Sequence, residues 1–405
     1  FCEIDSLAAS LLLGSTRVSR PSPSEHELDG FDWILRSPIP LPFRSEWRFR
    51  TLGAMLASSS PAEEDRPLLL GADSFGPLDV TLRDLRCAAQ RAGAWCKQQG
   101  VGEGDSLLLL RLPHSSEVPL AAAAIALMSQ AIRVVLPMSF DRDSLAAMCR
   151  ATQCRAILWC TGDVARAGHD QVGQADGMVR RVAEEMRLPT FSLDEQLQWH
   201  VRSDGGQQRD PPDFSATERE DREVLVLSTS GSTGTPKLVR YTESALLAVA
   251  ESWRAAGLFA EKLVGGRSMC HALSHSMGLR NVLHAVWNRQ PVMLVQPEWL
   301  EEKPKQFVKM LERCRPQHIT CGPALLRDLA LLSRSLRRVQ QGLESLECVV
   351  SSGAAAIASE TSLLAGVQTA NAFGMTEVQQ VLNTLLGPAD PPRGALGRPL
   401  PGVAV

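Results

Sequence analysis

The sequence predicts an α/β fold with two doubly wound sheets flanked by helices. Three observations lead to this prediction. From residue 78 onward, short apolar runs suited to buried parallel strands alternate with stretches of helical periodicity. A polar stretch, Ser203–Arg222, divides this alternation into two halves. With 405 residues, 44% of them hydrophobic and 21% charged, the chain is long enough for two or three domains with sizeable cores.

The individual elements follow from local patterns. Helices are expected where apolar residues recur at helical spacing and where a stop or start signal stands at the end. They are Leu82–Gly100, about Val118–Ser129, and one that begins near Thr242 with Glu243 in its first turn. Strands are expected at the short apolar runs that begin at Ser106, Ile132, Arg155, Glu223, Pro291, Gln317 and Leu346.

Composition argues against several classes of partner. A formal net charge of −3 gives no reason to expect a nucleic acid or an anionic membrane. The apolar stretch Pro119–Met128 is about half as long as a membrane span, so no span is predicted. The ten cysteines are scattered without a C-x-x-C pair, which favours reduced core cysteines in a cytoplasmic protein. His271 and His275 have no cysteine pair nearby, so zinc is not expected.

The segment "STSGSTGTPK", Ser228–Lys237, directly follows the predicted strand at Glu223. Gly231 and Gly234 allow sharp turns that expose backbone N–H groups, the hydroxyl side chains add donors, and Lys237 adds a positive charge. Such a concave set of donors is suited to phosphate oxygens. A flexible Gly/Ser linker is the alternative reading. The loop is not a Walker A motif, because Pro236 precedes the lysine, and no G-x-S-x-G hydrolase motif occurs.

This loop resembles the signature loop of the adenylate-forming superfamily, which contains acyl-CoA synthetases, luciferases and the adenylation domains of nonribosomal peptide synthetases. Other segments, from about Leu52 to the end, resemble further motifs of that family in the same order. They are "GVGEGD" before an apolar strand, "HALSHSMGL" (His271–Leu279), "SSGAAAIA" (Ser351–Ala358), "NAFGMTE" (Asn371–Glu377) and "GRPLPG" (Gly397–Gly402). Residues 1–50 match no pattern of the family.

The resemblance implies a domain organisation. Residues 1–50 form an N-terminal arm of unknown role, and residues 51–202 form a first α/β subdomain. Residues 203–370 form a second α/β subdomain with the phosphate loop. Residues 371–405 carry the adenine and magnesium motif and the start of a small β-barrel-like subdomain. The family's mobile C-terminal domain, with its lysine, and the ribose-binding aspartate are expected beyond Val405, so the chain is interpreted as part of a larger multidomain protein.

The resemblance also implies residue roles in a reaction of ATP with a carboxylic acid. Lys237, Thr376, Glu377 and His275 are the expected catalytic residues, with Glu377 as the Mg²⁺ ligand. Ser276, Met277 and Gly278 are expected at the substrate pocket. The residues expected to bind the nucleotide are Thr229, Ser230, Gly231, Ser232, Thr233, Gly234, Thr235, Ser352, Gly353, Ala354, Asn371, Ala372, Phe373, Gly374 and Met375.

Several of these residues have simpler interpretations. Thr376 and Glu377 on their own suit a helix N-cap pair. Phe373 suits core packing, and His275 suits a surface or core histidine with ordinary partners. Two other functions also stay open: an amidase-type serine hydrolase, and a non-catalytic adenylation-like domain that only binds partners.

The position after His275 bears on the substrate. Amino-acid-activating relatives commonly have an aspartate there, which holds the substrate ammonium, whereas this chain has Ser276. An unpaired ammonium is costly to bury, so a fatty, aryl or hydroxy/keto acid is favoured over an ordinary α-amino acid. The acyl group would then pass to a thiol, either of CoA or of a phosphopantetheinyl carrier, and the sequence does not distinguish the two.

Overall fold

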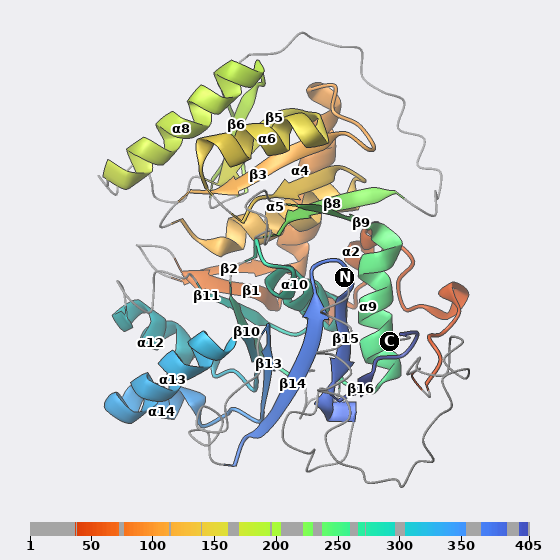
Figure 1. Ribbon diagram of the computed structural model, residues 1–405, viewed down its shortest axis with the longest axis vertical. Coiled ribbons are helices and arrows are strands. Elements are labelled where there is room, and N and C mark those ends of the chain that lie inside the picture. The colour runs from red at the N-terminus through yellow and green to blue at the C-terminus, as the bar shows by residue number, and fades with distance from the viewer. Residues whose placement is uncertain are drawn as a thin grey trace, which may run out of the picture.

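The computed structural model describes residues 37, 39–72, 77–112, 115–138, 140–160, 170–194, 197–203, 222–229, 237–259, 266–271, 273–295, 304–353, 366–386 and 397–403. Within these ranges the chain forms two sheets with helices on their faces (Figure 1). This arrangement confirms the predicted α/β class.

The first sheet has seven strands in the order β7-β6-β5-β3-β4-β8-β9. Neighbouring strands from β6 to β8 in this order pair in parallel, and β7 and β9 are antiparallel edges. Most of β3 and β8 is buried, as expected for apolar runs without alternation. The bounds are β3 Ser106–Arg111, β4 Arg133–Leu136, β5 Cys154–Cys160, β6 Thr190–Leu193, β7 Trp199–Ser203, β8 Glu223–Ser228 and β9 Leu238–Thr242.

The second sheet has nine strands in the order β16-β15-β14-β13-β12-β10-β11-β1-β2. Pairing is parallel from β14 to β1 and antiparallel at both ends, so β15 and β16 extend this sheet where a barrel-like subdomain was predicted to start. The bounds are β1 Pro67–Ala72, β2 Pro77–Thr81, β10 Ser268–His271, β11 Val292–Val295, β12 His318–Cys321, β13 Cys348–Ser352, β14 Gln368–Met375, β15 Gln379–Asn383 and β16 Arg398–Pro399.

The helices confirm the predicted starts. Thr81 and Asp84 form a capping box at the start of α4, and the Thr242 side chain accepts from the Ala245 N–H at the start of α9. The bounds are α2 Leu52–Ala57, α3 Pro61–Glu64, α4 Leu82–Gln98, α5 Glu117–Ser129, α6 Arg142–Thr152, α8 Asp170–Met186, α9 Glu243–Ala255, α10 Ser276–Asn288, α12 Pro304–Cys314, α13 Pro323–Ser335 and α14 Arg337–Leu343, with short 3₁₀ turns at Arg44–Glu46 and Thr384–Leu386.

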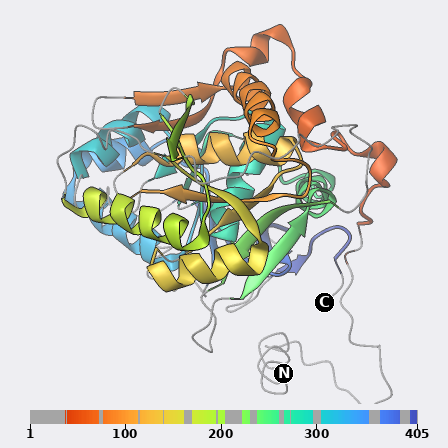
Figure 2. The same ribbon diagram turned by 90° about the horizontal axis from the view of Figure 1, so that it is seen from above.

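Helix α5 joins the two sheets into one core. Every residue from Glu117 to Met128 is buried, and the helix packs against β1 and β2 of one sheet and β3 and β4 of the other. A helix that is apolar on all sides needs such surroundings. Helices α6 and α8 lie side by side on the outer face of the seven-stranded sheet, and α12, α13 and α14 gather beside the nine-stranded sheet (Figures 1 and 2).

Sheet membership does not follow the predicted division of the chain near residue 203. Strands β8 and β9, on either side of the phosphate loop, belong to the seven-stranded sheet with β3–β7, whereas β1 and β2 pair into the nine-stranded sheet. The linear pattern of strands and helices cannot reveal this, because strand pairing joins segments far apart in the chain, such as β1 and β11. The polar stretch Ser203–Arg222 lies mostly outside the described residues.

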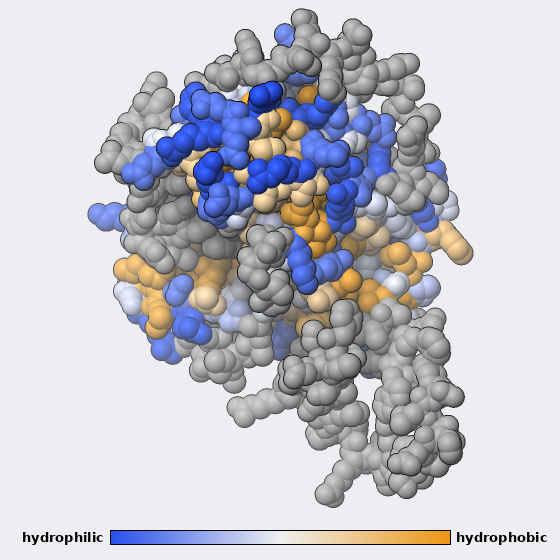
Figure 3. Space-filling view, turned by 45° about the horizontal axis from the view of Figure 1, so that its top comes forward, coloured by the Kyte–Doolittle hydropathy of each residue, from blue (hydrophilic) through white to orange (hydrophobic). Residues whose placement is uncertain are grey.

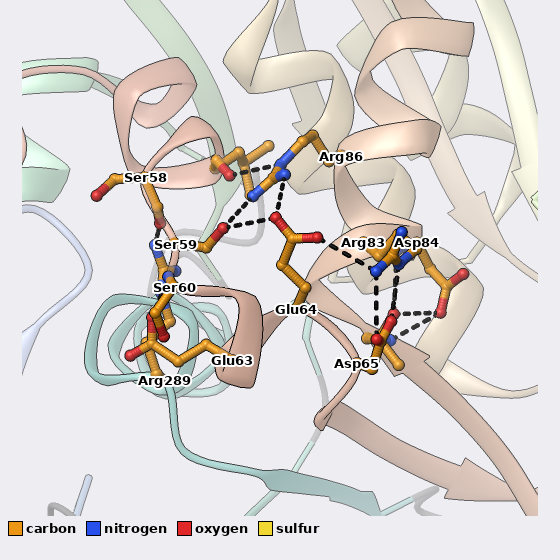
Figure 4. A network of polar contacts seen from close by, with 12 residues as sticks. Ser58, Ser59, Ser60, Glu63, Glu64, Asp65, Arg83, Asp84, Arg86 and Arg289 are labelled. Carbon is orange, nitrogen blue, oxygen red and sulfur yellow. Dashed lines mark hydrogen bonds and ion pairs between the residues drawn. The ribbon is translucent and has the colours of Figure 1, made fainter.

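The described part of the N-terminal arm packs onto the body. The Arg48 N–H donates to the buried Glu251 carboxylate of α9, and the Ser37 N–H donates to the Val403 carbonyl (3.2 Å). Farther along, a polar network joins α3 to α4 through Glu64 and Arg86 (2.9 Å) (Figure 4). These contacts attach the segment before β1 to helices of both halves.

Three further features concern the surface, the cysteines and the apolarity of the helices. On the face in Figure 3, hydrophilic residues gather over the part of the molecule that contains the seven-stranded sheet. Among the described residues, nine cysteines are present and all have free thiols. None of the described helices combines the length and apolarity that a membrane crossing requires.

Candidate functional site

The phosphate loop is held at its two ends. The Thr229 N–H donates to the Lys237 carbonyl (2.9 Å), where β8 and β9 begin to pair. The buried Ser228 hydroxyl accepts from the Met138 N–H (2.9 Å), which ties the end of β8 to the segment after β4. The seven positions between these ends lie outside the described residues, and with them the predicted roles of Ser230, Gly231, Ser232, Thr233, Gly234 and Thr235.

The second motif lies in the turn between β14 and β15. A bulge follows Phe373, and a Cβ on Gly374 would collide with the Gln379 carbonyl and lie 2.7 Å from the Gln380 Cα, so only glycine fits this close approach. Thr376 and Glu377 occupy the turn itself. The alternative of a helix N-cap pair is therefore wrong.

Tyr241, the single tyrosine of the chain, connects the two motifs. It lies on β9, four residues after Lys237, and its hydroxyl donates to the backbone carbonyl of Thr376. Burial, with a smaller contribution from the Glu377 charge, raises the pKa of Tyr241 to about 12, so the hydroxyl keeps its proton at neutral pH. A neutral donor thus holds the turn that carries Thr376 and Glu377 beside the strand that leaves the phosphate loop.

Both motifs line one cavity of about 370 Å³. Eleven of its thirteen lining residues were predicted site residues: Thr229, Lys237, His275, Ser276, Met277, Ser352, Gly353, Gly374, Met375, Thr376 and Glu377. The other two, Arg280 and Gln379, were not predicted. The distant segments on which the prediction depends therefore do face a shared space.

The N-terminus of α10 lines this cavity with His275, Ser276 and Met277, for which the sequence predicts a place at the substrate pocket. His275 is the N-cap residue, and its Nδ1 accepts from the Met277 N–H (3.2 Å), which leaves the proton on Nε2. Partial burial and the nearby Arg280 charge lower the pKa of His275. The ring is exposed and lines the cavity, which fits a neutral hydrogen-bonding group at its mouth.

Arg280 is a buried cation that the sequence analysis missed. It is only 5% exposed, and its Nε and Nη2 have no hydrogen-bond partner among the described residues. Its guanidinium carbon lies 5.4 Å from the centre of the Trp253 ring. Burial lowers the pKa of Arg280 to about 10, so the side chain is still charged at pH 7. One signal was available: a lone arginine four residues after Ser276, in a helix that is otherwise mostly apolar.

Other predicted residues do not line the cavity. Phe373 is 43% exposed, so the alternative that it packs in the core is wrong. Ala372 is 6% exposed and belongs to a core cluster with Trp253, and the Asn371 N–H donates to the Thr384 hydroxyl (2.8 Å). Gly278 is buried within α10. Ala354 lies outside the described residues. The nucleotide and substrate roles of these residues stay predictions.

The chemistry of the lining fits a polyphosphate with a hard cation. Among the described lining residues, the lysine and arginine cations are Lys237 and Arg280, and Glu377 is the single carboxylate. Hydroxyl donors are available from Thr229, Ser352 and Thr376. Mg²⁺ is often held by one or two carboxylates together with substrate phosphates, and an exposed Glu377 suits that role.

Comparison with known proteins agrees with this geometry. The family model "AMP-binding enzyme" matches residues 60–405. The nonribosomal peptide synthetase CymA of Salinispora arenicola is 26% identical over 340 residues, which is 82% of this chain and 4% of CymA. The acetyl-coenzyme A synthetase of Sodalis glossinidius is 28% identical over 199 residues, or 44% of this chain and 29% of that protein. The chain thus spans less than a third of either relative.

Solved structures share the fold at low identity. VinN in complex with L-aspartate has a TM-score of 0.64 at 21% identity, over 87% of this chain and 82% of VinN. The adenylation domain of a keto acid-selecting nonribosomal peptide synthetase module has a TM-score of 0.68 at 17% identity, over 92% of this chain and 73% of that domain. Together with the family match over most of the chain, these similarities confirm the resemblance, and the chain belongs to the AMP-binding enzyme family of the adenylate-forming superfamily.

Proposed function

We propose that the chain carries out ATP-dependent activation of a carboxylic acid as an acyl-adenylate, with release of pyrophosphate. The observation that carries this proposal is the single cavity lined by both Lys237, at the end of the phosphate loop, and the Thr376–Glu377 turn. In the reaction, a carboxylate oxygen bonds to the α-phosphorus of ATP, and the bond to the oxygen that bridges to the β-phosphorus breaks.

The lining residues suit this reaction because a carboxylate is already ionised at neutral pH and no general base is needed. The protein's task is to bring two anions together and to stabilise charge on the leaving pyrophosphate. Lys237 and the loop donors would bind the β- and γ-phosphates, and Thr376 would bind the α-phosphate. Glu377 would hold Mg²⁺, which would neutralise phosphate charge. Phe373, exposed beside this turn, would lie against the adenine.

We propose that the acyl-adenylate then transfers its acyl group to a thiol and releases AMP. The thiol belongs either to CoA or to the phosphopantetheine of a carrier domain. The two sequence relatives come one from each of these classes, a peptide synthetase and a CoA ligase. Family membership weighs against the amidase-type alternative. The retained lysine and Thr-Glu pair weigh against a domain that only binds partners.

For the substrate, we propose a carboxylic acid other than an ordinary α-amino acid. The fold alone does not determine the substrate, since one solved structure with this fold is a complex with L-aspartate and another is bound to a keto acyl adenylate. Ser276 lines the cavity next to His275 and offers no charge for a substrate ammonium. The nearest charged group on α10 is the Arg280 cation, which would repel one. A purely apolar fatty or aryl acid would leave that cation unpaired.

Carboxylate-dependent exchange of labelled pyrophosphate into ATP tests the proposal. The natural full-length protein is assayed with a panel of carboxylic acids, and with the variants Lys237→Ala and Glu377→Ala. We expect each variant to lose about 100-fold or more in exchange rate, as when a preorganised charge-stabilising group is removed. The matched control is Lys309→Ala, an exposed lysine on α12. Exchange near the wild-type rate for Glu377→Ala would show that the assigned metal role is wrong.

A further inference from the structure

Arg280 lies on the same face of α10 as the predicted substrate residues. Positions four apart on a helix are neighbours, so Arg280 follows Ser276 one turn deeper into the molecule. Both side chains line the cavity, together with Met277. Lys237 and Glu377 reach the cavity from strand ends instead. Arg280 therefore belongs to the substrate side of the cavity.

Among the described residues, no carboxylate pairs with Arg280, although Glu377 lines the same cavity. No carboxylate contributes to its pKa, which burial alone lowers. Its neighbours are rings and an amide, and several of their nitrogens are also buried without a partner in the described chain: Trp253 Nε1, Asn281 Nδ2, His284 Nε2 and His318 Nδ1. The pKa of His284 and the pKa of His318 are lowered by burial and by the Arg280 charge, so both rings are neutral at pH 7. The described part of this region therefore presents a buried cation that no carboxylate balances.

An anion would have to enter through the main cavity. A second cavity, lined by Trp253, His284 and His318 but not by Arg280, has a volume of only about 10 Å³. That volume is barely enough for one water molecule. Within the described part of the chain, the 370 Å³ cavity is thus where the guanidinium has room to meet a carboxylate.

A buried cation without a partner is costly, and it favours a ligand that supplies the missing charge. A ketone or hydroxyl oxygen would satisfy hydrogen bonds but would leave the charge in place. A carboxylate does both, and its two oxygens match the planar guanidinium. We propose that the chain selects a dicarboxylic acid, one carboxylate being activated by ATP while the second pairs with Arg280. This inference rests on the proposed adenylation function and narrows its substrate.

Matched acids test this selection in pyrophosphate exchange with the natural full-length protein. The panel contains the dicarboxylic acids from malonic to adipic and, for each, its monoamide and the monoacid of the same chain length. We expect the best dicarboxylic acid to exceed its own monoamide in kcat/KM by about 100-fold, because a site built for a charged group rejects the neutral analogue. Equal rates for the two would overturn the proposal, as would preference for an α-keto monoacid. In both cases the adenylation function would stand.

The variant Arg280→Met gives a second test. We expect the ratio of dicarboxylic acid to monoacid kcat/KM to fall by about 100-fold, with Arg334→Met, an exposed arginine of α13, as the control that keeps the wild-type ratio. A raised KM for ATP with an unchanged acid ratio would show that Arg280 contacts phosphate instead. If Arg280→Met does not fold, binding of the dicarboxylic acid and its monoamide to the wild-type protein, measured by calorimetry, decides the question. If the dicarboxylic acid binds selectively but no acid supports exchange, the adenylation proposal is contradicted and the pairing with Arg280 is not.

Discussion

Two buried arginines at the two ends of α10 differ in how the protein accommodates their charge. Arg289, the C-cap residue, is 7% exposed and Arg280 is 5% exposed, and burial lowers the pKa of each to about 10. Arg289 donates from Nη1 to the Val286 carbonyl (2.6 Å), and from Nη2 to the carbonyls of Met55 (2.5 Å) and Ser58. The Nε and Nη2 of Arg280 make no such bond within the described chain.

This difference separates a structural role from a binding role. Arg289 joins the end of α10 to the turn after α2, within the network drawn in Figure 4. Its partners are part of the chain and are present in every state of the folded protein. Arg280 lines a cavity and has its charge in place before any partner arrives. Preorganised charge of this kind is typical of a site that recognises a ligand.

The largest expected effect concerns Arg289. Arg289→Met would remove the side-chain donor from the carbonyl oxygens of Met55, Ser58 and Val286, of which Val286 keeps its bond from the Arg289 N–H, so we expect the free energy of unfolding to fall by about 3 kcal/mol. Urea denaturation monitored by circular dichroism measures this change, with Arg334→Met as the surface control. A loss below about 0.5 kcal/mol would contradict the structural role assigned to Arg289.

The next effect uses acid to probe the surroundings of Arg280. The pKa of His318 is about 3 in the folded protein, mainly because the ring is buried and secondarily because Arg280 is near, and about 6.5 when unfolded. Below pH 6.5 the unfolded chain therefore binds a proton that the folded chain does not. Stability contributed by the neutral ring is full above pH 6.5 and is lost as the pH falls.

Between pH 6.5 and pH 5 this loss amounts to about 1.6 kcal/mol for His318. Urea denaturation at both pH values measures the decrease in the free energy of unfolding. In the variant His318→Gln this decrease should be smaller than in the wild type by the contribution of His318. A variant that loses stability as steeply as the wild type would show that His318 does not stay neutral in the folded protein.

The smallest effect, and one of opposite sign, is expected for Arg280→Met. Removal of an unpaired buried charge should raise the free energy of unfolding by about 1 kcal/mol in the absence of substrate, since apolar replacements of buried ions are often stabilising. The same denaturation experiment measures it. A destabilisation as large as that of Arg289→Met would mean that Arg280 has a structural partner and would remove the contrast between the two arginines.

The elements and motifs were predictable because their signals are local. The strand at Glu223, the loop after it and the helix beginning after Thr242 are contiguous in the sequence, and each has its own pattern of spacing or capping. The Thr376–Glu377 motif was likewise found from adjacent residues. The structural context of this motif was not predictable. The turn between β14 and β15 depends on the close approach of Gly374 to Gln379, which the residue pattern does not reveal.

What the amino-acid order established here is the family, the α/β class and the identity of most of the residues that line the cavity, since these depend on short-range patterns. The partition of strands between the two sheets, the hydrogen bond from Tyr241 to Thr376 and the unpaired burial of Arg280 depended on packing. Each of these features joins segments that are far apart in the chain. The burial of a charge and the identity of its neighbours are therefore defined only when those segments pack together.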